Sequence, residues 1–324
     1  MTSAPARTPR TDPPAGPPAA PRPGRDRAAA AAARRAERRL RRAARRDSVP
    51  HGLRGSTGGR IGRALLLTLA AVVTVFPFYA MVVLSLKPAA AVEFPSSLVP
   101  WPLGGEAYRS VMDSQDVPRW LLNTLVYSLT SVVGVLLLSS LAGYAFAKKR
   151  FPGREAMFWS FLSMVMVPYH VTMIPTFAMI AKLGGVDTYW GLIVPTLANA
   201  QAVFLMRQFI QGLPDELFEA ARLDGCSELQ IFGRIVLPLL KPILATLGVF
   251  VFLWHWNDFL WPLVVGQSTD MRTLTVGIAS LQQQNVPLNV VLSGSVIAFV
   301  PIFAAYLVGQ RYFTEGVTAS GIKG

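Results

Sequence analysis

The chain has 324 residues, of which 52% are hydrophobic and only 15% are charged, and its mean hydropathy is +0.40. This composition is too apolar for an ordinary soluble protein and predicts a membrane protein. The net charge of +13 does not indicate a nucleic-acid-binding surface, because residues 1–63 hold 16 arginines and four acids and the remainder is nearly neutral.

The first 60 residues are expected to form a disordered tail. Residues 1–27 are rich in Pro, Ala, Gly and Arg, a composition that buries too little apolar surface to offset the chain entropy. The segment Ala28–Arg46 alternates alanine runs with arginines and has high helix propensity. Two interpretations stay open for it: a basic helix against anionic lipid head groups, or a solvated tail that helps to set the orientation of the chain. The second is favoured.

Six apolar stretches follow the tail, each long enough for the ~20 helical residues that cross ~30 Å of hydrocarbon. They are Ala64–Leu86, Leu121–Phe146, Met157–Ile180, Tyr189–Phe209, Ile243–Val265 and Val290–Val308. Several contain proline, which membrane helices tolerate because neighbouring helices satisfy the freed carbonyl groups. The pattern predicts an all-α integral membrane protein with six transmembrane helices, some of them bent.

The distribution of Lys and Arg predicts the orientation of these helices, because positive loops stay in the cytoplasm. With the N-terminus inside, 26 basic residues are cytoplasmic and five lie outside, so both termini are expected in the cytoplasm. The expected parts are a tail (1–60), the first transmembrane helix with its outer loop (61–118), a transmembrane core (119–310) and a cytoplasmic C-terminal tail (311–324). The first apolar stretch is too long for a signal peptide and is interpreted as an uncleaved anchor.

The cytoplasmic loop at residues 211–241 is predicted to form an elbow of two helices. Pro214 and the acids that follow it suit a helix N-terminus, and this helix is expected to run through Leu223. Gly225 is expected to end it in the left-handed conformation, and Ser227 begins a capping box for a second helix. Pro238 is expected to close that second helix.

The spacing within this loop resembles the EAA loop of the permeases of ABC importers. Glu-Ala-Ala is followed after three residues by glycine, and after nine more by Ile-Val-Leu-Pro. The resemblance implies a type-I importer permease fold, in which this loop docks into a groove of the ATPase subunit. The residues that it implicates in ATPase coupling are Glu219, Ala220, Ala221, Asp224, Gly225, Ile235, Leu237 and Pro238.

Other stretches are similar to the carbohydrate-importer branch, the maltose-permease-like inner-membrane subunits. They include Ser85–Pro88, Ala142–Ala147, Trp256–Pro262 and Gln310–Phe313. The segment Ala319–Ile322 departs from the ending that is usual in this branch. The resemblance implies four kinds of partner: an ABC ATPase dimer, a second permease subunit, an extracytoplasmic solute-binding protein and membrane lipids. No nucleic acid is expected.

The chain lacks the motifs that an enzyme of this kind would need. A P-loop requires Gly-Lys followed by Ser or Thr, and no Gly-Lys pair occurs in the sequence. We therefore expect ATP and Mg²⁺ to be bound by the partner ATPase, with no cofactor in this chain. Its single cysteine, Cys226, and its three isolated histidines do not suggest a metal site.

Polar and aromatic residues within the spans are candidates for a substrate path. Carbohydrates are bound by aromatic rings together with amide and carboxylate groups, and an acid at membrane depth faces protein or a water-filled path. The candidates are Asn123, Tyr127, Asn199, Trp256, Asn257 and Asp258, with Gln201 and Trp254 beside them. The equally weighted alternative places the tryptophans in the outer aromatic belt and gives Asp258 a structural hydrogen bond.

Together these features predict the permease subunit of an ATP-driven carbohydrate importer that works by alternating access in the bacterial plasma membrane. The alternatives are an ABC permease for another solute, such as glycerol phosphate or a polyamine, and a secondary transporter or channel. A non-transporting membrane scaffold is disfavoured by the polar residues in the spans. The outer loop Gln267–Asn289 is expected to face the solute-binding protein.

Overall fold

The computed structural model describes residues 57–92, 98–113, 116–284 and 286–320. Every regular element in these ranges is helical. The chain divides into two compact units, Met1–Thr74 and Val75–Gly324, and each is considered by itself. The expected tail at 1–60, apart from its last four residues, and its candidate basic helix at Ala28–Arg46 lie outside the described residues.

The first helix, α2 (Thr57–Ser85), is apolar along most of its length and carries Pro77 within it. Its described part in the first unit exposes large aliphatic side chains, such as Leu67 at 68%, which is a surface suited to lipid. Farther along the helix, Val83 and Ser85 are buried in the second unit. A short helix, η2 (Ala89–Ala91), follows it.

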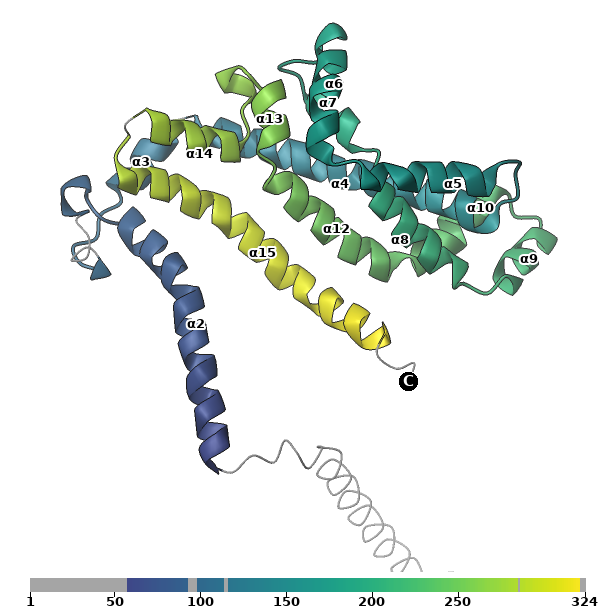
Figure 1. The fold of residues 1–324 in the computed structure, drawn as a ribbon, viewed down its shortest axis with the longest axis horizontal. Coiled ribbons are helices and arrows are strands. Elements are labelled where there is room, and N and C mark those ends of the chain that lie inside the picture. The colour runs from purple at the N-terminus through teal and green to yellow at the C-terminus, as the bar shows by residue number, and fades with distance from the viewer. Residues whose placement is uncertain (1–56, 93–97, 114–115, 285, 321–324) are drawn as a thin grey trace, which may run out of the picture. The chain divides into compact units, whose positions relative to one another are not determined.

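The long helix α4 (Val117–Lys148) is the element against which most of the second unit packs. The helices α8 (Ala200–Gln211) and α12 (Lys241–Trp256) lie along it (Figure 1). The helices α4 and α8 approach so closely at Gly143 that there is no room for a side chain: a Cβ atom there would lie 2.6 Å from Cβ of Met206.

Proline and backbone breaks bend two of the six expected spans, and another bend lies just before the fifth span. The third is α5 (Arg154–Ser163) with η4 (Met164–Met166), followed after Pro168 by α6 (Tyr169–Lys182) at an angle of 103°. The fourth is α7 (Tyr189–Ile193) with η5 (Val194–Thr196), followed by α8 at 46°. The helical segment Glu228–Leu239 meets α12 at 76°.

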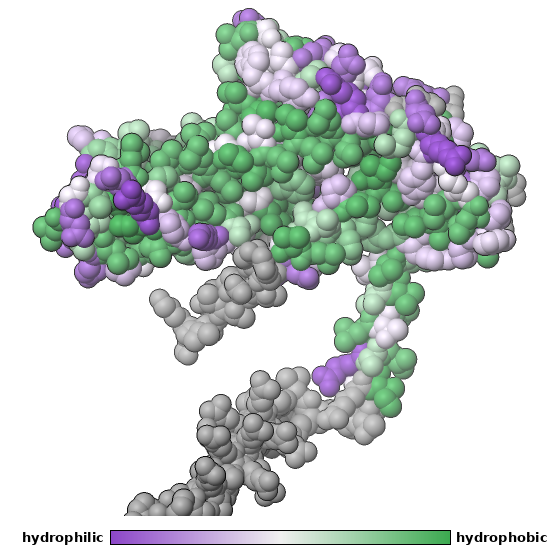
Figure 2. Space-filling model, turned by 180° about the vertical axis from the view of Figure 1, so that it is seen from behind, coloured by the Kyte–Doolittle hydropathy of each residue, from purple (hydrophilic) through white to green (hydrophobic). Residues whose placement is uncertain are grey.

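By length and apolar composition, three helices could each cross a membrane, or up to six if every bent pair is one span. The three unbroken ones are Ile61–Ser85 of α2, Val117–Lys148 of α4 and Leu288–Gln310 of α15 (Leu288–Ser320). Five of the six stretches predicted from hydropathy coincide with these helices and bent pairs, whereas the fifth, Ile243–Val265, shares only α12 with its pair. Figure 2 shows hydrophobic residues over a broad area of one face, with hydrophilic residues gathered mainly toward its edges.

The fifth span is shorter than the predicted stretch Ile243–Val265. The helix α12 ends at Trp256, and the chain breaks at Asn257 before α13 (Leu260–Val265). The following segment contains η7 (Thr269–Met271) and α14 (Leu274–Gln283). Since Leu274 and Leu281 are fully buried, α14 packs against α4 and α15 instead of forming an open loop.

The two ends of α4 carry different neighbours (Figure 1). At one end lie α14 and α3 (Glu106–Asp113). At the other end lies the loop after α8, which contains α9 (Glu216–Leu223) and α10 (Glu228–Ile231).

Candidate functional site

The loop after α8 folds into the two helices of an elbow, which we define as residues 213–239. Asp215 precedes α9, and Gly225 ends the turn after it with φ +77°, the left-handed conformation that favours glycine. Ser227 accepts a hydrogen bond from the backbone N–H of Gln230, whose side chain accepts one from the N–H of Ser227. The predicted elbow, its glycine turn and its capping box are therefore confirmed.

The end of the second elbow helix differs from the prediction. Pro238 does not close it, because the helix continues as a π-helical segment, η6 (Phe232–Val236), and then α11 (Leu237–Leu239). The bend comes at Leu240, just before Lys241 and Pro242. The wider π turn lets the helix pass Pro238, which has no N–H to donate to the preceding turn.

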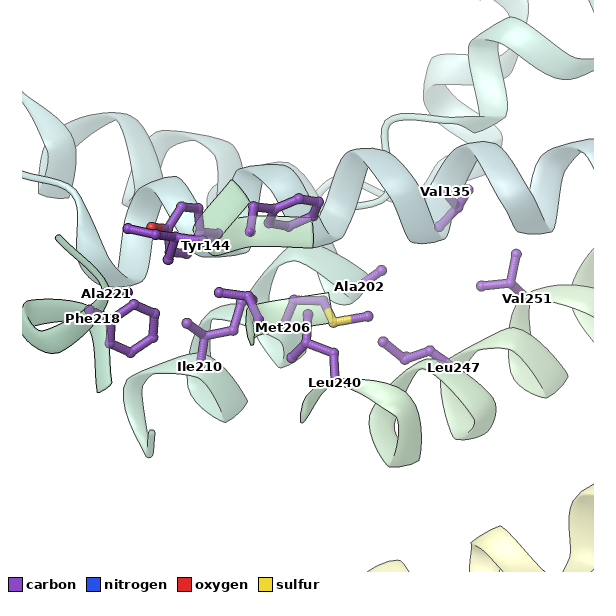
Figure 3. Packing of buried hydrophobic residues seen from close by; sticks show 13 residues of the cluster. Val135, Tyr144, Ala202, Met206, Ile210, Phe218, Ala221, Leu240, Leu247 and Val251 are labelled. Atoms are coloured by element: carbon purple, nitrogen blue, oxygen red, sulfur yellow. The ribbon is translucent and has the colours of Figure 1, made fainter. Parts of the chain in front are cut away.

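An apolar cluster attaches the inner side of the elbow to the helix bundle (Figure 3). Phe218 of α9 is 2% exposed, and Ile231 of α10 is fully buried. They belong to one cluster with Tyr144 of α4 and Met206 and Ile210 of α8. Truncation of a buried phenylalanine to alanine costs about 3–5 kcal/mol, so this packing fixes the elbow firmly.

Glu228, the first residue of α10, connects the elbow to the end of α4 through its carboxylate. Its Oε2 accepts a hydrogen bond from the Tyr144 hydroxyl at 2.8 Å and forms an ion pair with Lys149. Its Oε1 lies 3.4 Å from Nε of Arg222 of α9. One carboxylate thus joins both elbow helices to α4, and as an acid in a first helical turn it also suits the helix dipole.

Lys148 makes the second polar connection between α4 and the elbow. Its Nζ donates to Oδ1 of Asp215 at 2.6 Å and to the carbonyl of Leu213 at 2.7 Å, and it lies 4.9 Å from the ring centre of Phe218. The hydrogen bond and charge of Lys148 lower the pKa of the Asp215 carboxyl below its ordinary value. Asp215 itself is solvent-exposed, so its carboxylate also stays hydrated.

The outer side of the elbow has no such attachments among the described residues and presents small and apolar groups. Leu223 is 88% exposed and Leu229 is 78% exposed. A Cβ atom at Gly225 would have no neighbour within 4 Å. Exposed leucines around an open glycine make a surface suited to docking another protein.

The residues implicated by the EAA resemblance divide between the two sides of the elbow. Ala221 is 5% exposed and Ile235 is half-buried, and both pack in the apolar cluster. The others are exposed: Glu219, Ala220, Asp224, Gly225, Leu237 and Pro238.

Sequence reasoning missed the residues that hold the elbow in place. Tyr144 and Glu228 are 84 positions apart, and no local pattern connects them. From the sequence, Lys148 and Lys149 were only two of the 26 basic residues that indicate the orientation of the chain in the membrane. The sequence did offer a signal: an acid just before or at the start of each elbow helix, Asp215 and Glu228, and a basic pair at the end of the second predicted span.

Among the candidates for a substrate path, the structure brings Tyr127 and Asp258 together. The hydroxyl of Tyr127, which is fully buried in α4, donates to Oδ2 of Asp258 at 2.8 Å. The backbone carbonyl of Asp258 accepts a hydrogen bond from Thr275 at 2.7 Å. Asp258 therefore takes part in packing the segment after α12 against α4.

Two other candidates, Asn123 and Trp256, are buried in the same region. The Asn123 amide donates to the carbonyls of Asp270 and Arg272 at 2.7 and 2.8 Å and accepts from the Tyr189 hydroxyl at 2.7 Å. The indole of Trp256 is 1% exposed and donates to the carbonyl of Ala298.

The remaining candidates, Asn199 and Asn257, lie nearer the surface. Asn199 caps α8 by accepting a hydrogen bond from the N–H of Ala202 at 2.9 Å, and it lines a pocket between α8 and α12. Asn257 is exposed and donates to the carbonyl of Leu253 in its own helix. Within the described ranges, no group of three or more His, Cys, Asp or Glu side chains is placed to hold a metal ion.

Comparisons with known proteins agree with this arrangement. Residues 135–318 match the family described as binding-protein-dependent transport system inner membrane component. The arabinooligosaccharides transport system permease protein AraQ of Bacillus subtilis is 36% identical over 270 residues, which cover 82% of this chain and 96% of AraQ. The sn-glycerol-3-phosphate transport system permease protein UgpE of Rhizobium meliloti is 34% identical, over 78% of this chain and 94% of UgpE.

A solved structure has the same fold. It is a chain in the crystal structure of a bacterial ABC transporter involved in the import of the acidic polysaccharide alginate. The two chains superpose with a TM-score of 0.71 and 27% sequence identity, covering 80% of this chain and 99% of the other. This chain therefore belongs to the family of inner-membrane permease components of binding-protein-dependent transport systems.

Proposed function

We propose that this chain is the permease subunit of an ATP-driven importer that carries a carbohydrate across the bacterial plasma membrane by alternating access. The observation that carries the proposal is the two-sided elbow, whose inner side packs against α4 and α8 and is ion-paired to the end of α4, while most of its motif residues are exposed. The names of its relatives support a saccharide as the substrate, since one is an arabinooligosaccharide permease and another belongs to an alginate importer.

The proposal includes a topology of six transmembrane spans with both termini in the cytoplasm. The described helices and bent pairs supply enough apolar length for six spans. The elbow carries Arg222 and Arg234 and follows the basic end of α4, which supports a cytoplasmic position for it. The proposed parts are the tail at 1–60, the first span and outer loop at 61–118, the core at 119–310 with its coupling loop at 211–241, and the tail at 311–324.

The proposed source of energy is ATP hydrolysis by a partner ABC ATPase dimer, which binds ATP and Mg²⁺ and docks on the outer side of the elbow. Closure of that dimer would push the elbow, and the Glu228 and Lys148 contacts would pass the displacement to α4. A second permease subunit completes the path, and a solute-binding protein delivers the substrate at the opposite end of the bundle. The conformational change is thereby a rigid-body movement of packed helices.

A phosphate ester is the alternative substrate, because UgpE relatives transport glycerol 3-phosphate by name. A phosphate at membrane depth would require Lys or Arg close to it. The pocket between α8 and α12 is lined by neither residue type. The lining of this pocket supports a saccharide as the substrate more than a phosphate ester.

Substitution at Gly225 tests the coupling role. Gly225→Trp adds bulk to the open outer side of the elbow and should abolish uptake and binding-protein-stimulated ATP hydrolysis, while the protein still inserts into the membrane. Gly225→Asn is the matched control, since asparagine tolerates a positive φ and adds little bulk. Uptake should stay within a few-fold of the unmodified protein in the control. Normal coupled transport by Gly225→Trp would contradict the docking of an ATPase at this surface.

A further inference from the structure

The pocket between α8 and α12 contains polar groups that the rest of the described chain does not satisfy. Its volume is about 240 Å³, and its lining includes Asn199, Gln201 and Trp254. Gln201 is exposed, and Trp254 is 63% exposed. Within the described residues, neither the Gln201 amide, nor Nδ2 of Asn199, nor the indole N–H of Trp254 makes a hydrogen bond.

Trp254 differs in this respect from the buried tryptophans around it. The indole N–H of Trp256 donates to the carbonyl of Ala298 at 3.1 Å, and that of Trp261 donates to the carbonyl of Leu192 at 3.0 Å. Buried tryptophans are normally paired in this way. Trp254 instead lines the pocket and is largely exposed, so packing within the described residues does not explain its position.

The pocket lies deep in the membrane by helix length. Gln201 precedes the end of α8 at Gln211 by ten residues, which corresponds to ~15 Å along the helix. Trp254 follows the start of α12 at Lys241 by thirteen residues, or ~20 Å. Both distances fall well inside the ~30 Å hydrocarbon layer, so Trp254 lies short of the outer aromatic belt.

An unpaired amide at this depth is costly against lipid and indicates a water-filled or ligand-filled space. His255, which forms part of the wall, is 3% exposed and uses both ring nitrogens, on the carbonyl of Val251 at 2.7 Å and the hydroxyl of Thr196 at 3.1 Å. Both ring nitrogens of His255 are therefore already bonded within the chain and are not free to bind a ligand. The groups left for a ligand are two uncharged amides and an aromatic face with a single donor.

We propose that Gln201 and Trp254, with Asn199, form a subsite for an uncharged saccharide on this chain's wall of the transport path. The sugar ring stacks on the indole of Trp254, and its hydroxyls bond with the two amides. Complete ligand pockets usually measure ~300–1,000 Å³. The volume of this pocket is smaller, which is consistent with one side of a transport path whose other side a second permease supplies. The inference rests on the proposed function and extends it by assigning a binding role to this face.

The test uses the complete transporter, purified with its ATPase, second permease and solute-binding protein and reconstituted in vesicles. Uptake of radiolabelled arabinooligosaccharides is measured for the unmodified complex, Gln201→Leu and Trp254→Leu. Both variants should lower uptake about tenfold, while assembly and binding-protein-stimulated ATP hydrolysis remain within twofold. The control is Leu137→Ala on α4, an exposed apolar position about 16 Å from the end of its helix. Its uptake should not change.

Thiol labelling provides a second readout, in which the reactivity of the thiol does not depend on which sugar is carried. Cys226 is the chain's only cysteine, so Cys226→Ser gives a cysteine-free background. In that background, Gln201→Cys should react with a water-soluble thiol reagent, and arabinooligosaccharides with the binding protein should slow the reaction. Leu137→Cys should stay unreactive, because exposed apolar residues at Val133 and Leu141 flank it and indicate a lipid-facing surface.

The outcomes separate the subsite from the proposed function. Unreactive Gln201→Cys, or unchanged uptake in both leucine variants, would overturn the subsite while sugar import by the unmodified complex stands. If the unmodified complex transports glycerol 3-phosphate and no saccharide, the proposed substrate class is wrong. If glycerol 3-phosphate also slows the labelling of Gln201→Cys, the ligand of the subsite is not an uncharged saccharide.

Discussion

The two ends of α4 are joined to their neighbours by different chemistry. At the elbow end, Lys148 and Lys149 reach exposed or half-exposed carboxylates, at Asp215 and Glu228. At the opposite end, Arg119 and several neutral side chains of α4 bond to the backbone of residues 269–274, and the bonds of the neutral side chains are part-buried or buried. Solvated ion pairs are individually weak and reversible, whereas buried amide networks are costly to disturb.

This difference suits the roles that we propose for the two ends. The outer end has to keep α4, η7 and α14 in one arrangement, and close packing reinforces it: a Cβ atom at Gly277 of α14 would overlap the Trp120 ring of α4. The elbow end has to follow a moving ATPase. There the apolar cluster keeps the helices together, and the ion pairs can adjust because the carboxylates of Asp215 and Glu228 are open to solvent.

The largest expected effect comes from removing the amide at the outer end. Asn123→Leu keeps the volume but leaves the Arg272 carbonyl and the Tyr189 hydroxyl without their partner, while the Asp270 carbonyl keeps only Arg119. Each unpaired buried group costs about 1–3 kcal/mol, so for these two groups we expect a loss of about 2 kcal/mol or more. Thermal unfolding of the purified protein in detergent measures it.

Asn257→Leu is the matched control for this substitution. The Asn257 side chain is exposed and bonds only to Leu253 of its own helix, so the expected change in unfolding temperature is small. Equal destabilisation by the two substitutions would contradict the contrast between a buried network and an exposed amide.

Glu228→Gln should have an intermediate effect, at the elbow end. Glutamine can still accept the Tyr144 hydrogen bond but loses the charge that pairs with Lys149 and Arg222. Because the carboxylate is half-exposed, the loss of stability should not exceed about 1 kcal/mol. The expected signature is functional: less sugar carried per ATP hydrolysed, measured in vesicles.

Glu216→Gln provides the control, because Glu216 is an exposed acid in the first turn of α9. It should leave the ratio of transport to hydrolysis unchanged. A Glu228→Gln protein with the normal ratio would show that the apolar cluster alone positions the elbow.

The sequence allowed a good prediction of the elements and a poorer one of their connections. Hydropathy located the apolar helices, and local signals at Gly225 and Ser227 located the elbow, because each depends on residues close in the chain. The proline at position 168 predicts a bend in the third span. Its angle of 103° could not be predicted, because the angle depends on which helices pack against each half of the span. The break after Trp256 was missed, because the predicted stretch Ile243–Val265 extends across the polar pair Asn257 and Asp258.

The site residues show the same division. The exposed residues of the elbow were identified from a short motif, whereas the Tyr144–Glu228 bond requires knowledge of which helix passes the elbow. The pocket at Gln201 and Trp254 depends on which side of each helix stays uncovered. Aromatic content alone singled out Trp256 and Trp254 together, and only their burial separates a packed tryptophan from an open one.

The smallest expected effect is that of Asp215→Asn, and pH reveals it. Lys148 lowers the pKa of Asp215 in the folded protein, so the stability from this pair is fully present above the unfolded pKa of ~3.9. It is lost as the pH falls through the lower, folded pKa. We therefore expect Asp215→Asn to unfold at a slightly lower temperature than the unmodified protein at pH 7, and the difference to shrink as the pH falls toward 3. High salt at pH 7 should also reduce it, because the pair is hydrated. A difference that grows on acidification would show that the Asp215–Lys148 contact does not help to hold the elbow.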